Sequence, residues 1–449
     1  MRQMLMGSDP EHFVLQGGKV VAAHTLGVPP QKHKEALPGG YMYRDGFAVE
    51  FAPFADECRA MFSNSLMALY SDGLMRLNEM GEDEFYSTPP QELPITFSME
   101  PLHAFGKEEF KELMESCPED LKQFGCSPAY DAYEDGKPIR VRVRPSEWPY
   151  RTTGGHMHYT LWQGGNGTYS GPTECAVVSP ELAEAVEKGK DVVARKLLSP
   201  LVRRLDACVG LAYTALFPQE QEQQRIRRRV YGKAGEFRLQ VYEKDGDGKP
   251  TVWGVEYRTL GPRLMLSSLT VGLFYGLMRE VCENTVDFSL LTPEKEKEVR
   301  ECIQSADSSR ALTLWGELFP NGVVDFMKTS LTSRVDYLLL SKDIMERVLT
   351  TPELALSFSA HTLPWEQQDA HTGWREWMHR NRLLCEVPTS REIPKACTWC
   401  YNYILPPDGM EGEYLSTERD GWVRGWYHLK CFTQSSDRIP DRYRKLEAA

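Results

Sequence analysis

Hydrophobic and polar residues alternate along six short segments in the N-terminal part of the chain, and Gly, Pro or Asp-Gly turns separate these segments. The segments are 47–53, 94–100, 139–145, 155–162, 236–243 and 252–260. Residues two apart lie on the same face of a strand, so this alternation predicts antiparallel strands with one buried face.

Apolar residues at helical spacing lie between these strands and predominate after Leu264. The pattern predicts helices over 56–80, 179–217, 264–281, 293–306, 311–319 and 334–349. In the second of these helices, the expected core face consists of Val192, Val193, Leu197, Leu201 and Leu205.

The change from strands to helices predicts an α+β protein in three parts. We expect a sheet domain over 1–265 and a helical region over 266–388 that packs on it. Pro388 and Pro394 indicate a linker to a small module over 389–449.

The composition narrows the class of protein. With 41% hydrophobic and 26% charged residues, the 449-residue chain is typical of globular proteins and is not a disordered or collagen-like one. A formal net charge of −12 makes the chain as a whole a poor binder of polyanions, so phosphate chemistry would need local basic groups or bridging cations. The sequence shows neither a signal peptide nor a run of about 18 apolar residues, and most of its cysteines are isolated. We therefore predict a soluble, cytoplasmic protein.

Pairs of acidic residues recur at the strands. Asp9 and Glu11 are two positions apart, and Asp45 precedes a strand in which Glu50 lies between Val49 and Phe51. Each pair alone is equally consistent with the solvated face of a half-exposed strand.

Three later strands carry polar residues at the same spacing of two. His156 and His158 follow a Gly-Gly pair, and two Glu-x-Arg sequences follow them, Glu236 with Arg238 and Glu256 with Arg258. Structural histidines and cross-strand salt bridges are the simpler explanations for each motif alone. If the polar faces converge, the oxygen ligands with an occasional imidazole suit Mg²⁺ or Mn²⁺, and the arginines suit phosphate oxygens. The chain has no GxxxxGK[ST] loop, so nucleotide phosphates would be held by metal ions on a sheet.

Six motifs together resemble those of a known family, the phage-encoded carboxylate–amine ligases of type 2, in the glutamine synthetase and glutamate–cysteine ligase superfamily. In chain order they are GSDPE, DGFAVEFAP, FGCSPAYDAY, RTTGGHMHYTL, YGKAGEFRL and GVEYRTLGP. The resemblance covers about residues 1 to 265. It implies a glutamine synthetase-like antiparallel sheet that holds Mg²⁺ and ATP. It also implies an amidoligase in which ATP activates a carboxylate as an acyl phosphate, and an amine then attacks to give an amide.

The resemblance also implies roles for individual residues. The expected Mg²⁺ ligands are Asp9, Glu11, Asp45, Glu50, His158 and Glu256, to which we add His156, a residue without a fixed role in the superfamily. Arg258 resembles the arginine that steadies the transferred phosphoryl group. Glu236 and Arg238 lie where substrate or phosphate contacts are expected, and Lys233 is placed to approach the nucleotide. The loops that select substrate in the glutamine and glutathione enzymes are not recognisable, so neither glutamate nor ammonia is implied.

The last segment carries a different metal-binding pattern. Cys397 and Cys400 form a CxxC pair, and His428 and Cys431 form an HxxC pair. Two such chelating pairs predict a tetrahedral, structural Zn²⁺ site, and the sequence around His428 resembles treble-clef fingers. Basic and acidic residues balance in this segment, so stabilisation or protein docking is favoured over nucleic-acid binding.

These patterns favour an ATP- and Mg²⁺-dependent carboxylate–amine ligase acting on small-molecule or peptide substrates, as a monomer or a homo-oligomer, with the zinc module as a contact for a macromolecular partner. Two alternatives stay open. One is a guanidino or amine phosphotransferase of the same superfamily, and the other is a zinc-finger binding module on an inactive scaffold. The basic run Arg225–Arg229 is either a solvated loop or the entrance for a polyanionic substrate.

Overall fold

The computed structural model describes the larger part of the chain. The described residues are 5–37, 39–56, helical positions between 62 and 77, 95–118, 129–141, 143–164, 173–265, 268–320, 323, 409–416, 421–428 and 444–447. Within this part, no helix is both long and apolar enough to span a membrane.

A 12-stranded sheet forms the centre of the molecule, and all its strand pairs are antiparallel. Its main path runs β3-β4-β5-β1-β11-β14-β13-β8-β9, while β2 and β6 pair with β1 and β12 pairs with β11. The strands along the path are β3 (Glu35–Leu37), β4 (Gly40–Asp45), β5 (Ala48–Pro53), β1 (Met6–Gln16), β11 (Gly155–Gln163), β14 (Pro250–Tyr257), β13 (Glu236–Lys244), β8 (Tyr130–Asp131) and β9 (Lys137–Pro138). The additional strands are β2 (Lys19–Val21), β6 (Ile95–Ser98) and β12 (Thr173–Glu174). The mixed α and β content and the large antiparallel sheet agree with the predicted fold class.

Five of the six predicted strands are present, as β5, β6, β11, β13 and β14. The exception is the segment 139–145, where the described residues after Pro138 are not in a strand and Pro145 begins a short 3-10 helix, Pro145–Glu147. The pairing of β8 with β9 covers two residues on each strand, and one further backbone hydrogen bond runs from Ile139 N–H to Ala129 O. Beyond it, no described residue of this segment pairs with a strand, so the alternation does not continue the sheet.

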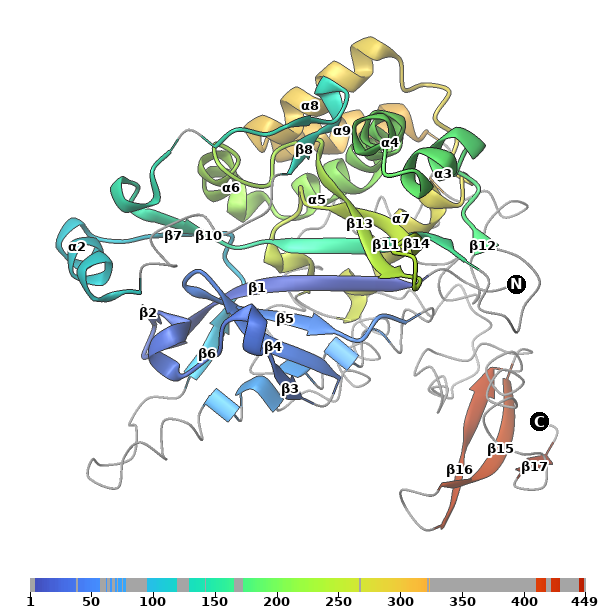
Figure 1. The fold of residues 1–449 in the computed structure, drawn as a ribbon, viewed down its shortest axis with the longest axis horizontal. Coiled ribbons are helices and arrows are strands. Elements are labelled where there is room, and N and C mark those ends of the chain that lie inside the picture. The colour runs from blue at the N-terminus through green and yellow to red at the C-terminus, as the bar shows by residue number, and fades with distance from the viewer. Residues whose placement is uncertain are drawn as a thin grey trace.

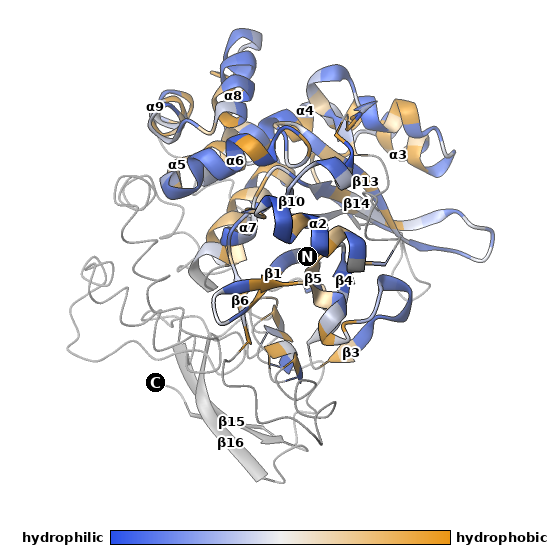
Figure 2. Ribbon diagram, turned by 90° about the vertical axis from the view of Figure 1, so that its left-hand side faces the viewer, coloured by the Kyte–Doolittle hydropathy of each residue, from blue (hydrophilic) through white to orange (hydrophobic). Residues whose placement is uncertain are grey.

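Helices cover one face of the sheet. Figure 1 shows α4, α5, α8 and α9 gathered on one side of β11, β13 and β14. The helices are α2 (Lys107–Ser116), α3 (Pro180–Glu187), α4 (Asp191–Leu205), α5 (Leu211–Leu216), α6 (Gln221–Arg227), α7 (Ser268–Cys282), α8 (Pro293–Ser305) and α9 (Ser308–Leu318). One continuous hydrophobic core joins the sheet to α7, α8 and α9 through residues such as Tyr257, Phe274, Ile303 and Trp315. Hydrophilic and hydrophobic residues mix along α3 and α4 in Figure 2, as expected of helices that cover a core.

The predicted helix over 179–217 is divided into shorter pieces, and its predicted core face was partly wrong. A turn at Gly189 separates α3 from α4, and one turn of π-helix, Asp206–Gly210, separates α4 from α5. Val192, Val193 and Leu197 are exposed. The buried face of α4 is instead Ala194, Leu198, Leu201, Val202 and Leu205. The spacing of three and four along this second set is the one that a helix needs to face a core.

The close approach of β14 to β11 can be tested by a substitution at Gly254. Its position opposite Thr160 lies beside a register shift between β11 and β14, and a Cβ there would approach Tyr159 O to 2.1 Å. Because the obstacle is backbone, Gly254→Ala is expected to destabilise the protein by about 1–3 kcal/mol in urea unfolding. Gly246→Ala is the matched control, since a Cβ at that position meets no atom within 4 Å. Equal stability of the two variants would contradict this packing.

Three C-terminal strands form a second sheet in the order β16-β15-β17. Their bounds are β15 (Gly409–Ser416), β16 (Gly421–His428) and β17 (Arg444–Glu447). His428 ends β16, whereas Cys397, Cys400 and Cys431 lie outside the described residues. The zinc site therefore stays a prediction. The cysteines at 117, 175, 208, 282 and 302 are buried thiols, as expected of isolated cysteines.

Candidate functional site

The predicted Mg²⁺ ligands, together with Glu236 and Arg238, share one face of six adjacent strands. The pairing places Asp9 of β1 opposite His156 of β11, and Glu11 opposite Glu50 of β5. It also places Glu256 of β14 between His158 on β11 and Arg238 on β13. Directly paired residues of an antiparallel sheet point to the same side, so β4, β5, β1, β11, β14 and β13 present one continuous polar surface. The opposite face carries apolar residues such as Met157, Val255 and Phe237, which pack in the core.

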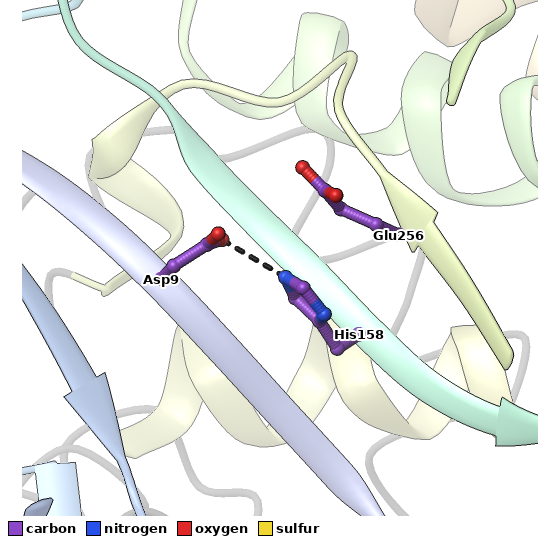
Figure 3. A group of neighbouring side chains, drawn as sticks. All are labelled: Asp9, His158 and Glu256. Atoms are coloured by element: carbon purple, nitrogen blue, oxygen red, sulfur yellow. Dashed lines mark hydrogen bonds and ion pairs between the residues drawn. The ribbon is translucent and has the colours of Figure 1, made fainter. Parts of the chain in front are cut away.

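Asp9, His158 and Glu256 form the first of two acidic clusters. Each offers a ligand atom, and these atoms all lie within 4.8 Å of one another. His158 Nε2 lies 3.0 Å from Asp9 Oδ1, and Figure 3 shows Glu256 facing this pair from the neighbouring strand. Two carboxylates and one imidazole converging in this way form a donor set that suits Mg²⁺ or Mn²⁺.

Two arginines lie against the first cluster. The Arg258 guanidinium pairs with Glu256 and also lies 3.4 Å from Glu236 Oε1, while Arg238 lies 3.3 Å from Glu256 Oε1. The amide of Gln240 donates a further hydrogen bond to Glu256. Arg258 and Glu256 are almost fully buried, so their charges act in a medium that screens them weakly.

Neighbouring charged side chains set the pKa values of the carboxylates in the first cluster. Burial disfavours the ionised forms of Asp9 and Glu256, but cationic neighbours outweigh it. The imidazoles of His158 and His156 hold the pKa of Asp9 well below its usual value, and Arg258 lowers the pKa of Glu256 to about 2. Both carboxylates are therefore ionised and available as ligands at neutral pH.

Glu11, Asp45 and Glu50 form the second acidic cluster, again with ligand atoms within 4.8 Å of one another. Glu11 and Glu50 are buried, and the Tyr43 hydroxyl donates a hydrogen bond of 2.6 Å to Glu50 Oε1. Burial together with Asp45 raises the pKa of Glu11 to about 8. Burial together with Asp9 and Asp45 raises the pKa of Glu50 well above its usual value. These carboxylates repel one another, and a divalent cation would remove that repulsion.

His156 belongs to neither acidic cluster but contacts two residues of the first and is linked to the second through Tyr231. Its Nδ1 lies 3.0 Å from Asp9 Oδ1 and 3.6 Å from Glu256 Oε1, and its Nε2 contacts the hydroxyl of Tyr231. Burial and Arg258 lower the pKa of this imidazole to about 4, so it is neutral at pH 7. This arrangement suits a residue that orients the carboxylates, and the predicted role of His156 as a ligand stays a prediction.

Among the described residues, four that contact predicted ligands escaped the sequence prediction: Tyr43, Tyr231, Gln240 and Tyr242. Tyr43 and Gln240 are each two positions from a predicted site residue, Asp45 and Arg238, so the strand period could have found them. Tyr231 precedes β13 outside any alternation, and no local signal marks it. The backbone N–H of Lys233 donates to Glu236 Oε2 at 3.0 Å, and its predicted contact with a nucleotide stays a prediction.

The basic run at 225–229 fits neither interpretation that the sequence left open. Arg227 and Arg228 are fully buried, and their guanidinium groups donate to the backbone carbonyls of Leu260 and Ile303. Arg225 is exposed and pairs with Glu222. The two buried arginines therefore tie α6 to the segment after β14 and to α8.

Comparison with known proteins gives a likeness to solved structures but none to a protein family. No protein-family model and no curated protein matches the sequence. Among solved structures, the chain is similar to one in the complex between the prokaryotic ubiquitin-like protein Pup and its ligase PafA. The match has a TM-score of 0.35 and 11% sequence identity, and it covers 86% of this chain and 68% of that chain.

Proposed function

We propose that the protein is an ATP- and Mg²⁺-dependent ligase that activates a carboxylate as an acyl phosphate and joins it to an amine. The observation that supports this most directly is the pair of acidic clusters on one sheet face, with Arg258 and Arg238 beside the first of them. This combination supplies positive charge to phosphate oxygens from metal ions and guanidinium groups together.

The residues present fit divalent cations. Asp9, His158 and Glu256 would hold one cation, and Glu11, Asp45 and Glu50 would hold another, because both donor sets are rich in the oxygens that Mg²⁺ prefers. When bound, Mg²⁺ would neutralise charge on the transferred phosphoryl group.

The arginines have separate tasks in this proposal. Glu236 and Glu256 flank Arg258 and fix the direction of its guanidinium group, so it is positioned before the substrate arrives. Arg238 is partly accessible, with a side chain that is 16% exposed, and can reach a phosphate or carboxylate oxygen. Since positioning and charge stabilisation supply most of the catalysis in phosphoryl transfer, the reaction needs no nucleophile from the protein.

The test is to follow ATP hydrolysis with a panel of carboxylic acids and amines. A ligase is expected to consume ATP at its full rate only when both a carboxylate and an amine are present, and to form an amide in equal amount. Release of phosphate with an acid and hydroxylamine, with formation of the hydroxamate, would report the acyl phosphate directly.

Two other outcomes would contradict the proposal. A phosphorylated amine or guanidine formed without any acid would identify a phosphotransferase. A protein that binds neither ATP nor Mn²⁺ would instead favour an inactive scaffold that carries a zinc-binding module. The turnover assay and this binding measurement together separate all three functions that the sequence left open.

A further inference from the structure

The hydroxyl group of Tyr231 contacts the second acidic cluster directly and is linked to the first through His156. It donates a hydrogen bond of 2.9 Å to Glu11 Oε1, in the second cluster. It also contacts Nε2 of His156. The other ring nitrogen of His156 lies beside Asp9 and Glu256, in the first cluster. One side chain therefore links the two groups of candidate ligands.

The ring of Tyr231 is held independently of its hydroxyl. The guanidinium groups of Arg227 and Arg258 lie 4.7 Å and 5.0 Å from its centroid. The imidazole of His156 meets the ring edge-on, with 5.4 Å between the two centroids. Contacts of this kind stabilise an aromatic ring through its faces and edges, so removal of the hydroxyl leaves them in place.

Gly154 leaves the room that this arrangement needs. A Cβ at Gly154 would lie 2.6 Å from the Tyr231 hydroxyl oxygen and 2.6 Å from His156 Nε2. Its φ angle is outside the left-handed region, so alanine is excluded by the two side chains and not by the backbone. The absence of a side chain at 154 thus permits the contact between Tyr231 and His156.

We propose that Tyr231 is a positioning residue that couples the two cation sites. This inference rests on the proposed function, because it requires both clusters to bind cations. A phenol hydroxyl has one proton and donates it to one acceptor at a time. A cation at the second cluster engages Glu11 and changes the partner available to Tyr231. The hydrogen bond to His156, and with it the orientation of Asp9 and Glu256, changes in response.

The test is a titration of the full-length protein with Mn²⁺ alone, followed by electron paramagnetic resonance. Wild-type protein is expected to bind two Mn²⁺ ions. Tyr231→Phe should weaken both binding steps by roughly tenfold, the low end of the effect of removing a group that orients metal ligands. Tyr43→Phe is the matched control, because it removes a hydroxyl that donates to Glu50 in the second cluster and should weaken one step.

Gly154→Ala provides a second route to the same result. Its methyl group would displace the Tyr231 hydroxyl, so this variant should also weaken both steps, and circular dichroism checks that each variant is folded. If Tyr231→Phe weakens one step only, or neither, the coupling role is wrong while the cation sites stand. If wild-type protein binds no Mn²⁺, the cation sites of the proposed function fail, and the inference fails with them.

Discussion

Glu256→Gln is expected to lower the acid- and amine-dependent ATP turnover of the protein by about a thousandfold. Glu256 is fully buried and contacts Arg258, Arg238 and Gln240. Glutamine preserves the size of the side chain but removes the charge, so the first cluster loses one of its two carboxylate ligands. Steady-state ATP turnover at saturating Mg²⁺ measures the effect.

The fold of this variant should persist, because Arg258 keeps Glu236 as an ion-pair partner. Glu220→Gln is the matched control. Glu220 is also fully buried and paired with an arginine, Arg263 at 2.7 Å, but it lies outside both acidic clusters. This control should lose stability and keep the turnover of its folded fraction. A folded Glu256→Gln protein with unchanged turnover would show that the catalytic site is elsewhere.

Divalent cations are expected to stabilise the protein, and to do so more strongly at pH 8.5 than at pH 5.5. Mg²⁺ or Mn²⁺ at about a hundred times its Kd should raise the midpoint of thermal unfolding by about 5 °C at the higher pH. The reason is the raised pKa of Glu11, about 8 in the folded protein against an ordinary value of 4.5. Without cations, the folded state holds this proton more tightly than the unfolded chain does. The corresponding stability is present below pH 4.5 and is lost as the pH rises through about 8.

A bound cation takes the place of the proton on Glu11. The loss of stability at high pH should therefore disappear when the cation is present. The carboxyl of Glu256 does not interfere. Its pKa of about 2 contributes stability that is lost only as the pH falls below 4.5. Glu11→Gln is the control, since it should reduce the pH dependence of the cation-free protein. Scanning calorimetry at the two pH values, with and without Mg²⁺, measures the shift in the unfolding midpoint. An equal shift at both pH values would contradict the role of Glu11 as a cation ligand with a raised pKa.

The strands were largely predictable because alternation is a local property. β5, β11, β13 and β14 follow directly from the period of two, and the helix predicted over 293–306 is α8, which begins at Pro293 with Thr292 as its N-cap. Where the prediction from sequence was wrong, the outcome depended on tertiary contacts. The segment 139–145 alternates like a strand, but its described residues are not part of one. The exposure of Val192 and Val193 depends on how α4 is rotated against the core.

The residues of the candidate site could be proposed one by one from the sequence, but their arrangement in space could not. Alternation placed Asp9 with Glu11 and His156 with His158 on shared faces, and Asp45 and Glu50 were a second acidic pair at a strand. The family resemblance then suggested that these residues bind metal. The register between strands, which divides these residues into two clusters, depends on pairings across more than 100 residues of sequence, such as Asp9 with His156. The contact of Tyr231 with Glu11 spans 220 positions and has no periodic signal.

The central position of β1 also has a consequence for synthesis of the protein on the ribosome. β1 pairs early with β5 on one side, but its other partner, β11, begins at Gly155. At translation rates of about 5–20 residues per second, that edge of β1 waits on the order of ten seconds or more for its partner. Asp9 and Glu11 place charge on one face of this waiting strand, and charged side chains discourage unpaired edges from joining other chains. The residues proposed to bind Mg²⁺ would then protect the nascent chain from aggregation before any site exists.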